Sequence, residues 1–172
     1  GGMAAVLIQE NAGSGNGTPY TKNILKNNTL VASIRMSDIF CGKASVQTAI
    51  YVFRVGEPHS TDSIVKFIDF SNDGYTRQNR KKSSQNVNLR DTDNAKERYA
   101  EVVKLVRYGK GLNNGNLHFF VDGETYFEDY VTLEGNDWTV QQHRKFNAVP
   151  SVEDFQKVVK DYLSWRVSQI LK

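Results

Sequence analysis

The chain has 172 residues, of which 39% are hydrophobic and 24% charged, and its formal net charge is +3. This length suits one domain, or one domain with a small appendage, and the composition excludes disorder along the whole chain. Cys41 is the only cysteine, which excludes an internal disulfide and favours a reducing compartment. No apolar run approaches the roughly 18–20 residues of a membrane helix, and no signal peptide is visible. We therefore expect a soluble cytoplasmic protein, whose mild basicity is compatible with nucleic-acid binding without requiring it.

The first half of the chain predicts strands around one short helix. The apolar run Met3–Gln9 has no polar alternation, so we expect a strand buried on both faces, as in a sheet flanked by helices. The Thr18-Pro19 pair begins a helix that ends at Asn27-Asn28. Val, Ile, Tyr and Phe enrichment predicts three further strands, at Leu30–Met36, Gln47–Val55 and Ile64–Phe70. A break at residues 56–58 separates the last two strands, which we expect to form an antiparallel pair.

The second half predicts a long loop between helices. Residues 71–94 are polar, and long loops inside compact domains are usually functional or mobile. A helix follows at Ala95–Tyr108, and the run HFFVDGETYFEDYVTLEG predicts irregular strands with a turn at Asp122-Gly123. The last segment, SVEDFQKVVKDYLSWRVSQILK, predicts a helix with a wide apolar face, which Ser151 and Asp154 begin with a weak capping box.

Several familiar sites are excluded by spacing. The histidines lie far apart and lack partners at zinc-binding intervals, so we expect no metal site and ordinary surface or loop positions for His59, His118 and His143. The segment CGKAS is not a phosphate-binding P-loop, because positions 37 and 44 are serine and alanine where that motif needs glycine and a hydroxyl residue. Nothing local lowers the pKa of Cys41, which we expect to be an inert thiol.

A glycine-rich stretch, GSGNG at residues 13–17, follows the first predicted strand. Dinucleotide-binding loops need the pattern G-x-G-x-x-G opening a helix, and here the last interval is wrong and Thr18-Pro19 separates the loop from the helix. A flexible loop near a site is therefore favoured over a cofactor cradle, which stays the alternative.

Three stretches, taken in order, resemble the C-terminal part of N6-adenine DNA methyltransferases, in particular the modification subunit of type I restriction–modification systems and its single-chain relatives. They are GGMAAVLIQENAGSGNG, ILKNNTLVASIRMSDIFCGKASVQTAIYVFRVGEP and VKFIDFSNDGYTRQNRKKS. The tail PSVEDFQKVVKDYLSWRVSQILK is also similar, whereas residues 95–149 match less distinctly. The family's donor-binding glycine motif and its (Asn/Asp)-Pro-Pro-(Tyr/Phe) motif are not in the chain.

The resemblance implies an α/β fold, namely the C-terminal part of a Rossmann-like methyltransferase with a mixed sheet, an antiparallel pair and a C-terminal helical segment. Residues 1–94 would be the C-terminal portion of the catalytic domain, and residues 95–172 a helical and irregular extension ending in a partner-docking helix. The complete enzyme would transfer a methyl group from S-adenosylmethionine to the adenine amino group. This chain alone would be inactive and would hold no cofactor.

The implied partners are DNA, a specificity subunit and the missing N-terminal methyltransferase half, and an unpaired sheet edge also favours self-association. A stand-alone DNA-binding or assembly module without catalysis is the alternative function. The two differ at Met3–Gln9: the methyltransferase needs a strand from outside the chain there, whereas the module needs a covered edge or a closed sheet.

The family packs an aromatic side chain against an adenine rotated out of the duplex, and Phe40 in DIFCGK matches that position. The alternative is a phenylalanine that plugs the end of the sheet. Lys43 would contact phosphate or lie solvated. A basic cluster in the long loop would neutralise phosphates, or would be an ordinary solvated charge run; its residues are Arg77, Arg80, Lys81 and Lys82.

The C-terminal helix carries apolar side chains on more than one side, which is typical of helices that are buried or that bind a partner. The resemblance implies docking on a specificity subunit, through Phe155, Tyr162 and Trp165. Packing of the helix onto the chain's own core is the alternative.

Overall fold

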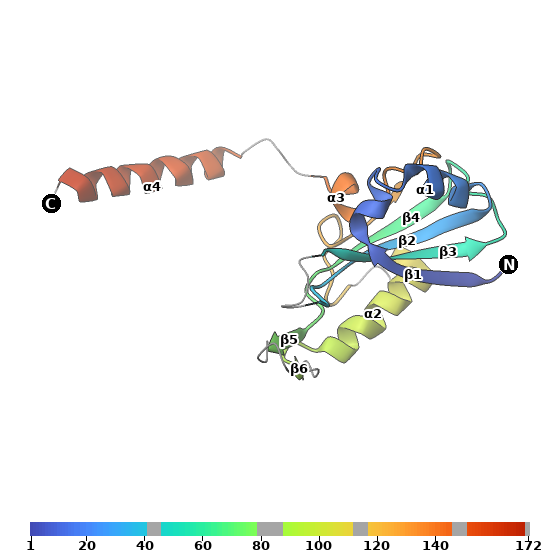
Figure 1. The fold of residues 1–172 in the computed structure, drawn as a ribbon. Coiled ribbons are helices and arrows are strands. Elements are labelled where there is room, and N and C mark those ends of the chain that lie inside the picture. Colours follow the sequence, from blue (N-terminus) through green and yellow to red (C-terminus); the bar gives the residue numbers. More distant parts are fainter. Residues whose placement is uncertain (41–45, 79–87, 112–116, 146–150, 171–172) are drawn as a thin grey trace.

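A mixed five-stranded sheet forms the centre of the protein in the computed structural model, which describes residues 1–40, 46–78, 88–111, 117–145 and 151–170. Its strand order is β1-β3-β2-β4-β7 (Figure 1). The strands are β1 (Met3–Gln9), β2 (Asn28–Met36), β3 (Thr48–Val55), β4 (Ile64–Phe70) and β7 (Tyr126–Tyr130). Strand β2 is parallel to β4, and all other neighbouring pairs are antiparallel. The predicted α/β fold with a mixed sheet and a C-terminal helix is confirmed.

Helices cover both faces of the sheet. The helical elements are the short 3-10 helix η1 (Glu10–Gly13), then α1 (Thr18–Leu25), α2 (Ala95–Tyr108), α3 (Val140–His143) and α4 (Val152–Ile170). Pro19 lies in the first turn of α1, where its missing N–H costs no hydrogen bond. Figure 1 shows α1 and α3 on one side of the sheet and α2 on the other.

Each face of the sheet has its own hydrophobic core. Under α1 and α3, Trp138 packs edge-on against Tyr51 and Phe53, with ring centroids 5.4 and 5.6 Å apart. Under α2, Leu105 lies fully buried with Phe70 and other residues of the sheet. Alternate side chains of the central strands β2, β3 and β4 point into opposite cores, which is why these strands are almost continuously apolar.

Strand β1 is an exposed edge strand. The sequence predicts the strand correctly, but the expectation that it is buried on both faces is wrong. It pairs only with β3, and no other described strand lies along its outer edge. Four of its large apolar side chains are exposed: Met3, Val6, Leu7 and Ile8. An apolar run predicts that a strand is buried against other segments, but it does not show whether those segments belong to the same chain.

The expected antiparallel pairing of β3 with β4 is wrong. Strand β3 has both edges occupied, by β1 on one side and β2 on the other. The connection after Val55 therefore carries the chain past β2, and β4 pairs with the far edge of β2 in parallel. Strand composition predicts that these segments are strands, but not which of the possible neighbours each one takes.

Residues 71–94 are not one continuous loop, as expected, because they contain β5 (Tyr75–Gln78) and β6 (Asn88–Asp91). These strands pair antiparallel from Tyr75↔Asp91 to Gln78↔Asn88 and form a separate two-stranded ladder, here called the β5–β6 arm. The bounds predicted for α2 are confirmed. The domain boundary expected after residue 94 stays a prediction, although β7, which follows it, belongs to the central sheet.

Helix α4 extends away from the sheet, as Figure 1 shows. Its first turn is capped as expected, because the Asp154 carboxylate accepts hydrogen bonds from the Ser151 amide and hydroxyl, at 3.0 and 2.8 Å. Within the ranges given above, no helix is both long enough and apolar enough to cross a membrane.

Gly13 lies where a side chain does not fit. A Cβ atom added there would lie 2.5 Å from the Tyr51 hydroxyl oxygen and 2.8 Å from the Trp138 Cβ. We expect Gly13→Ala to lower the free energy of unfolding by about 2 kcal/mol, as overpacked cores do. Gly2→Ala is the matched control, because its added Cβ meets no atom within 4 Å. Urea denaturation measures both, and equal stability of the two variants would contradict the packing role of Gly13.

Candidate functional site

The carboxyl ends of three strands lie together at one end of the sheet. This end is here called the carboxyl edge, and it is distinct from the lateral edge formed by β1. Strands β1 and β2 are both antiparallel to β3 and hence parallel to each other, and β4 is parallel to β2. The chain leaves these strands at Glu10, Ser37 and Ser71. Because open α/β sheets bind ligands at the carboxyl ends of their parallel strands, this edge is the candidate functional site.

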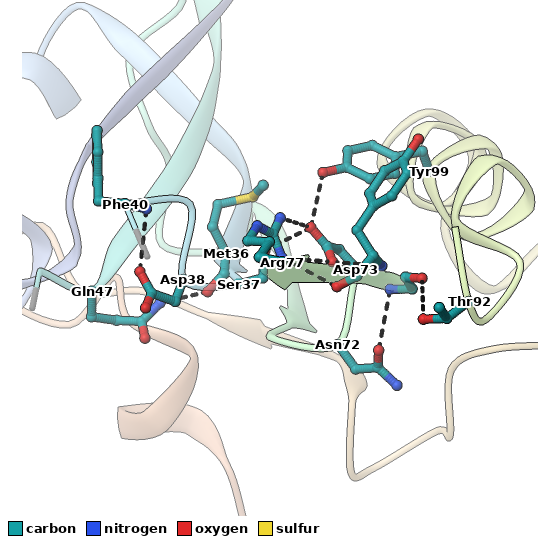
Figure 2. A network of polar contacts seen from close by, with 12 residues as sticks. Met36, Ser37, Asp38, Phe40, Gln47, Asn72, Asp73, Arg77, Thr92 and Tyr99 are labelled. Atoms are coloured by element: carbon teal, nitrogen blue, oxygen red, sulfur yellow. Dashed lines mark hydrogen bonds and ion pairs between the residues drawn. The ribbon is translucent and has the colours of Figure 1, made fainter. Parts of the chain in front are cut away.

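Phe40 lies in the turn that follows β2 at this edge. Its backbone N–H donates to the Asp38 carboxylate at 3.2 Å, and its side chain is 43% exposed (Figure 2). On the strand side of the turn, the Gln47 side-chain amide donates to the Met36 carbonyl at 2.6 Å. An exposed ring does not match the alternative in which Phe40 plugs the end of the sheet. Its predicted contact with a base stays a prediction.

Asp73, in the turn between β4 and β5, is the most enclosed charged group at this edge, with a side chain only 2% exposed. Its carboxylate accepts hydrogen bonds from the Ser37 hydroxyl at 2.7 Å, the Arg77 guanidinium at 3.1 Å and the Tyr99 hydroxyl at 3.3 Å. A second guanidinium nitrogen of Arg77 also pairs with it. These donors come from the end of β2, from β5 and from α2, so Asp73 joins three segments (Figure 2).

The protonation of Asp73 follows from this environment. Burial alone would raise the pKa of the Asp73 carboxyl, but the hydrogen bonds from Arg77 and Ser37 outweigh it and hold the pKa below its ordinary value. The hydrogen bond to Asp73 in turn raises the pKa of Arg77. Asp73 is therefore ionised at neutral pH and forms a buried ion pair.

The predicted phosphate-binding residues are differently placed. The Arg77 side chain is 13% exposed and its guanidinium is directed at Asp73, so its described role is internal. Its expected contact with DNA stays a prediction, and would require the guanidinium to leave Asp73. The other four expected contacts lie outside the described residues; they are Lys43, Arg80, Lys81 and Lys82.

A second group of charges lies along the same sheet edge, which sequence reasoning missed. Arg35 Nε is 3.9 Å from the Glu10 carboxylate, and Arg144 is 3.5 Å from the carboxylate of Asp69, which neighbours Arg35 across the β2–β4 register. Burial raises the pKa of Glu10, while the charge of Arg35 acts in the opposite direction. Charged residues at or just after the ends of apolar strands are the sequence signal that would have found this group.

Gly13 of the glycine-rich loop, His59 and His143 contribute to packing. Gly13 is buried, and its carbonyl accepts a hydrogen bond from the Trp138 backbone at 2.9 Å. His59 lies in the loop between β3 and β4, which agrees with the expected surface or loop position, but its side chain is buried, and burial lowers its pKa. His143 stacks on the core residue Phe67 and lies 3.0 Å from the Asp129 carboxylate. Among the residues that the structure describes, no three metal-binding side chains come together.

The three residues expected to dock a partner are exposed on α4. They are Phe155, Tyr162 and Trp165, and the last two rings lie 5.9 Å apart. The alternative, in which α4 packs onto the chain's own core, does not occur in this structure, since the side chains described from 152 to 169 are all exposed.

No family model and no curated protein matches the chain. Among solved structures, a chain from a study of complex assembly and conformational transition of the type I R-M system is 15% identical, with a TM-score of 0.53. The similarity covers 98% of this chain but only 34% of that one. A modification subunit of a putative type I restriction enzyme from Vibrio vulnificus YJ016 is 14% identical over 75% of this chain and 22% of its own. The TM-score of this second comparison is 0.46. The first similarity shows a shared fold, in which this chain spans about a third of the longer one.

We expect Asp73→Asn to lower the free energy of unfolding by about 3 kcal/mol at pH 7, because it leaves the partly buried Arg77 guanidinium without its counter-charge. The pKa of Asp73 is lower in the folded than in the unfolded state. Its stabilising effect is therefore complete above the unfolded pKa, near pH 4, and is lost as the pH falls through the folded pKa. Urea denaturation should show the difference between wild type and variant shrinking below about pH 4.

Asp62→Asn is the control for this experiment, because Asp62 is exposed in the connection before β4. We expect it to change stability by no more than about 0.5 kcal/mol. A difference between wild type and Asp73→Asn that stays constant down to pH 2 would show that the carboxylate charge is not responsible.

Proposed function

We propose that this chain is the C-terminal part of a site-specific DNA adenine-N6 methyltransferase of a restriction–modification system. The observation that carries the proposal is the exposed β1 edge, with apolar side chains and an unpaired backbone among the described residues. Soluble proteins rarely leave such a strand bare, because it would pair with other chains. A further strand alongside β1 would extend the sheet laterally and place one of its own ends beside the carboxyl ends of β1, β2 and β4, which form the candidate site. The shared fold with a chain of the type I R-M system supports this arrangement.

In this proposal the chain stacks on the target base and contacts the phosphates of the DNA backbone. The adenine amino group is inaccessible inside the duplex, so the base must rotate out and be held. Phe40 is exposed at the carboxyl edge and would stack on the extruded base. The basic cluster, with Lys43, would neutralise phosphates and position the duplex without reading its sequence.

Donor binding and subunit assembly would involve other polypeptide segments. The methyl donor, S-adenosylmethionine, would be held by the N-terminal half of the methyltransferase, together with the (Asn/Asp)-Pro-Pro-(Tyr/Phe) motif. Helix α4 would dock on a specificity subunit through Phe155, Tyr162 and Trp165. In the absence of the other half, the β1 edges of two copies could pair with each other, which accounts for the expected self-association. The assembled enzyme would act in the cytoplasm.

The direct test combines this chain with the polypeptide encoded immediately upstream of Gly1 and measures N6-methyladenine in DNA incubated with S-adenosylmethionine. We expect methylation by the mixture and none by this chain alone. Phe40→Ala should lower kcat/KM for methylation about tenfold or more, the usual effect of losing one base–aromatic stack. Tyr130→Ala is the matched control, because it removes an exposed aromatic ring that pairs with Ile64, the first residue of β4, at the opposite end of that strand from the candidate site. DNA binding by this chain without methylation in any mixture would favour the stand-alone module.

A second experiment tests the phosphate contacts. We expect the double variant Arg80→Glu, Lys81→Glu to bind DNA more weakly and to reduce the slope of log affinity against log salt by about 2, since each phosphate contact contributes about 0.9. The control is Lys157→Glu with Lys160→Glu, which makes the same charge change on exposed positions of α4. Equal slopes for the two double variants, measured by fluorescence anisotropy, would show that the basic cluster does not contact DNA.

A further inference from the structure

The turn that carries Phe40 is tethered to the rest of the protein through Ser37. Ser37 is buried at the end of β2, one residue before Asp38, whose carboxylate accepts the Phe40 N–H. Its hydroxyl donates to Asp73 at 2.7 Å. Adjacent Cα atoms lie about 3.8 Å apart, so a hydrogen bond that holds Ser37 limits where the turn can begin. Figure 2 shows Ser37 between the Phe40 turn and Asp73.

The other partners of Asp73 belong to the segments beside this turn. Arg77 is on β5, and the Tyr99 hydroxyl comes from α2 at 3.3 Å. Asp73 itself is fixed by its own turn, where it accepts the Tyr75 N–H at 3.1 Å. The left-handed backbone of Gly74 places that glycine's carbonyl to accept the amides of residues 92 and 93, both at 3.1 Å, which ties the turn to the end of the β5–β6 arm.

One carboxylate therefore contacts two elements that the proposed function assigns to DNA: the Phe40 turn, through Ser37, and the β5–β6 arm, through Arg77. Ser37 donates to Oδ2 of the carboxylate, and Arg77 donates to both Oδ1 and Oδ2. A carboxylate with two oxygens can hold both donors at once, and the bond to a charged acceptor is stronger than one to a neutral acceptor.

We propose that Ser37 and Asp73 are positioning residues for Phe40: their hydrogen bond holds the Phe40 turn in register with the β5–β6 arm, so that an extruded base meets the ring while the arm contacts the DNA backbone. Neither residue touches the base. The proposal rests on the proposed function, since it assumes that Phe40 stacks on a base, and it adds which residues determine the placement of that ring.

The test uses this chain assembled with its upstream half and a duplex that carries 2-aminopurine opposite a mismatched base, which lowers the cost of extrusion. Stacking of the extruded base is followed by 2-aminopurine fluorescence, and backbone contacts by the salt dependence of affinity. We expect Ser37→Ala to weaken the stacked complex about fivefold, which corresponds to the net free energy of one hydrogen bond. The slope of log affinity against log salt should stay unchanged. In a Phe40→Ala background, Ser37→Ala should cause no further loss, because there is no ring to position.

Ser71→Ala is the matched control. It removes a hydroxyl–carboxylate hydrogen bond of the same kind at the same sheet edge, between Ser71 and Asp69 at 2.6 Å, without touching the Phe40 turn. We expect it to stack the base as the wild type does. If Ser37→Ala does not fold, Ser37→Cys preserves the side-chain volume and replaces the hydroxyl with a weaker donor, and a loss of about twofold is then expected.

The outcomes separate the two proposals. A normal stacking signal in Ser37→Ala, or an equal loss in the presence and absence of the Phe40 ring, would overturn the positioning role while leaving the proposed function intact. A normal signal in Phe40→Ala itself would overturn both. A salt slope that falls in Ser37→Ala together with the stacking signal would indicate general loss of structure and would also contradict a specific positioning role.

Discussion

The buried carboxylate of Asp73 is the interaction on which the candidate site depends. Three elements converge on it: the end of β2, the base of the β5–β6 arm and the first turns of α2. An ionised group at such depth would destabilise the fold if it lost its hydrogen-bond donors. The fold therefore depends both on these donors and on the turn that orients the carboxylate. The arrangement of the carboxyl edge is thus determined by charge and hydrogen bonding more than by apolar packing.

At β1, in contrast, apolar side chains are exposed to solvent. Both faces of the central strands are packed by α1, α3 and α2, but none of these helices extends fully over β1. A groove of about 280 Å³ between the sheet and α2, lined by Ala5, Ile50 and Val103 among others, continues this uncovered surface. The bare edge and the groove are adjacent, so one additional strand with its helix would cover both. This is the arrangement that the methyltransferase proposal requires.

The sequence predicts the elements well and their surroundings poorly, for identifiable reasons. The helix at Ala95–Tyr108 and the strand at Ile64–Phe70 have the expected bounds, because local periodicity and a terminating glycine specify them. The partner of β4 and the exposure of β1 depend on contacts between distant segments, which periodicity does not encode. The site follows the same division. Phe40 is predicted as a site residue through the resemblance of its turn to a family turn, and this stays a prediction, whereas Asp73 belongs to a polar stretch in which its burial has no local signal.

The two tryptophans of the chain lie in opposite environments. Trp138 is enclosed by Tyr51 and Phe53 beneath α3, while Trp165 is exposed on α4. Indole emission shifts to shorter wavelength when the ring is shielded from water, so the chain contains two built-in optical reporters. Emission from Trp138 would follow unfolding of the sheet, and a blue shift of Trp165 would follow burial of α4 by a partner. With each indole replaced in turn by phenylalanine, the two events can be observed separately without an attached label.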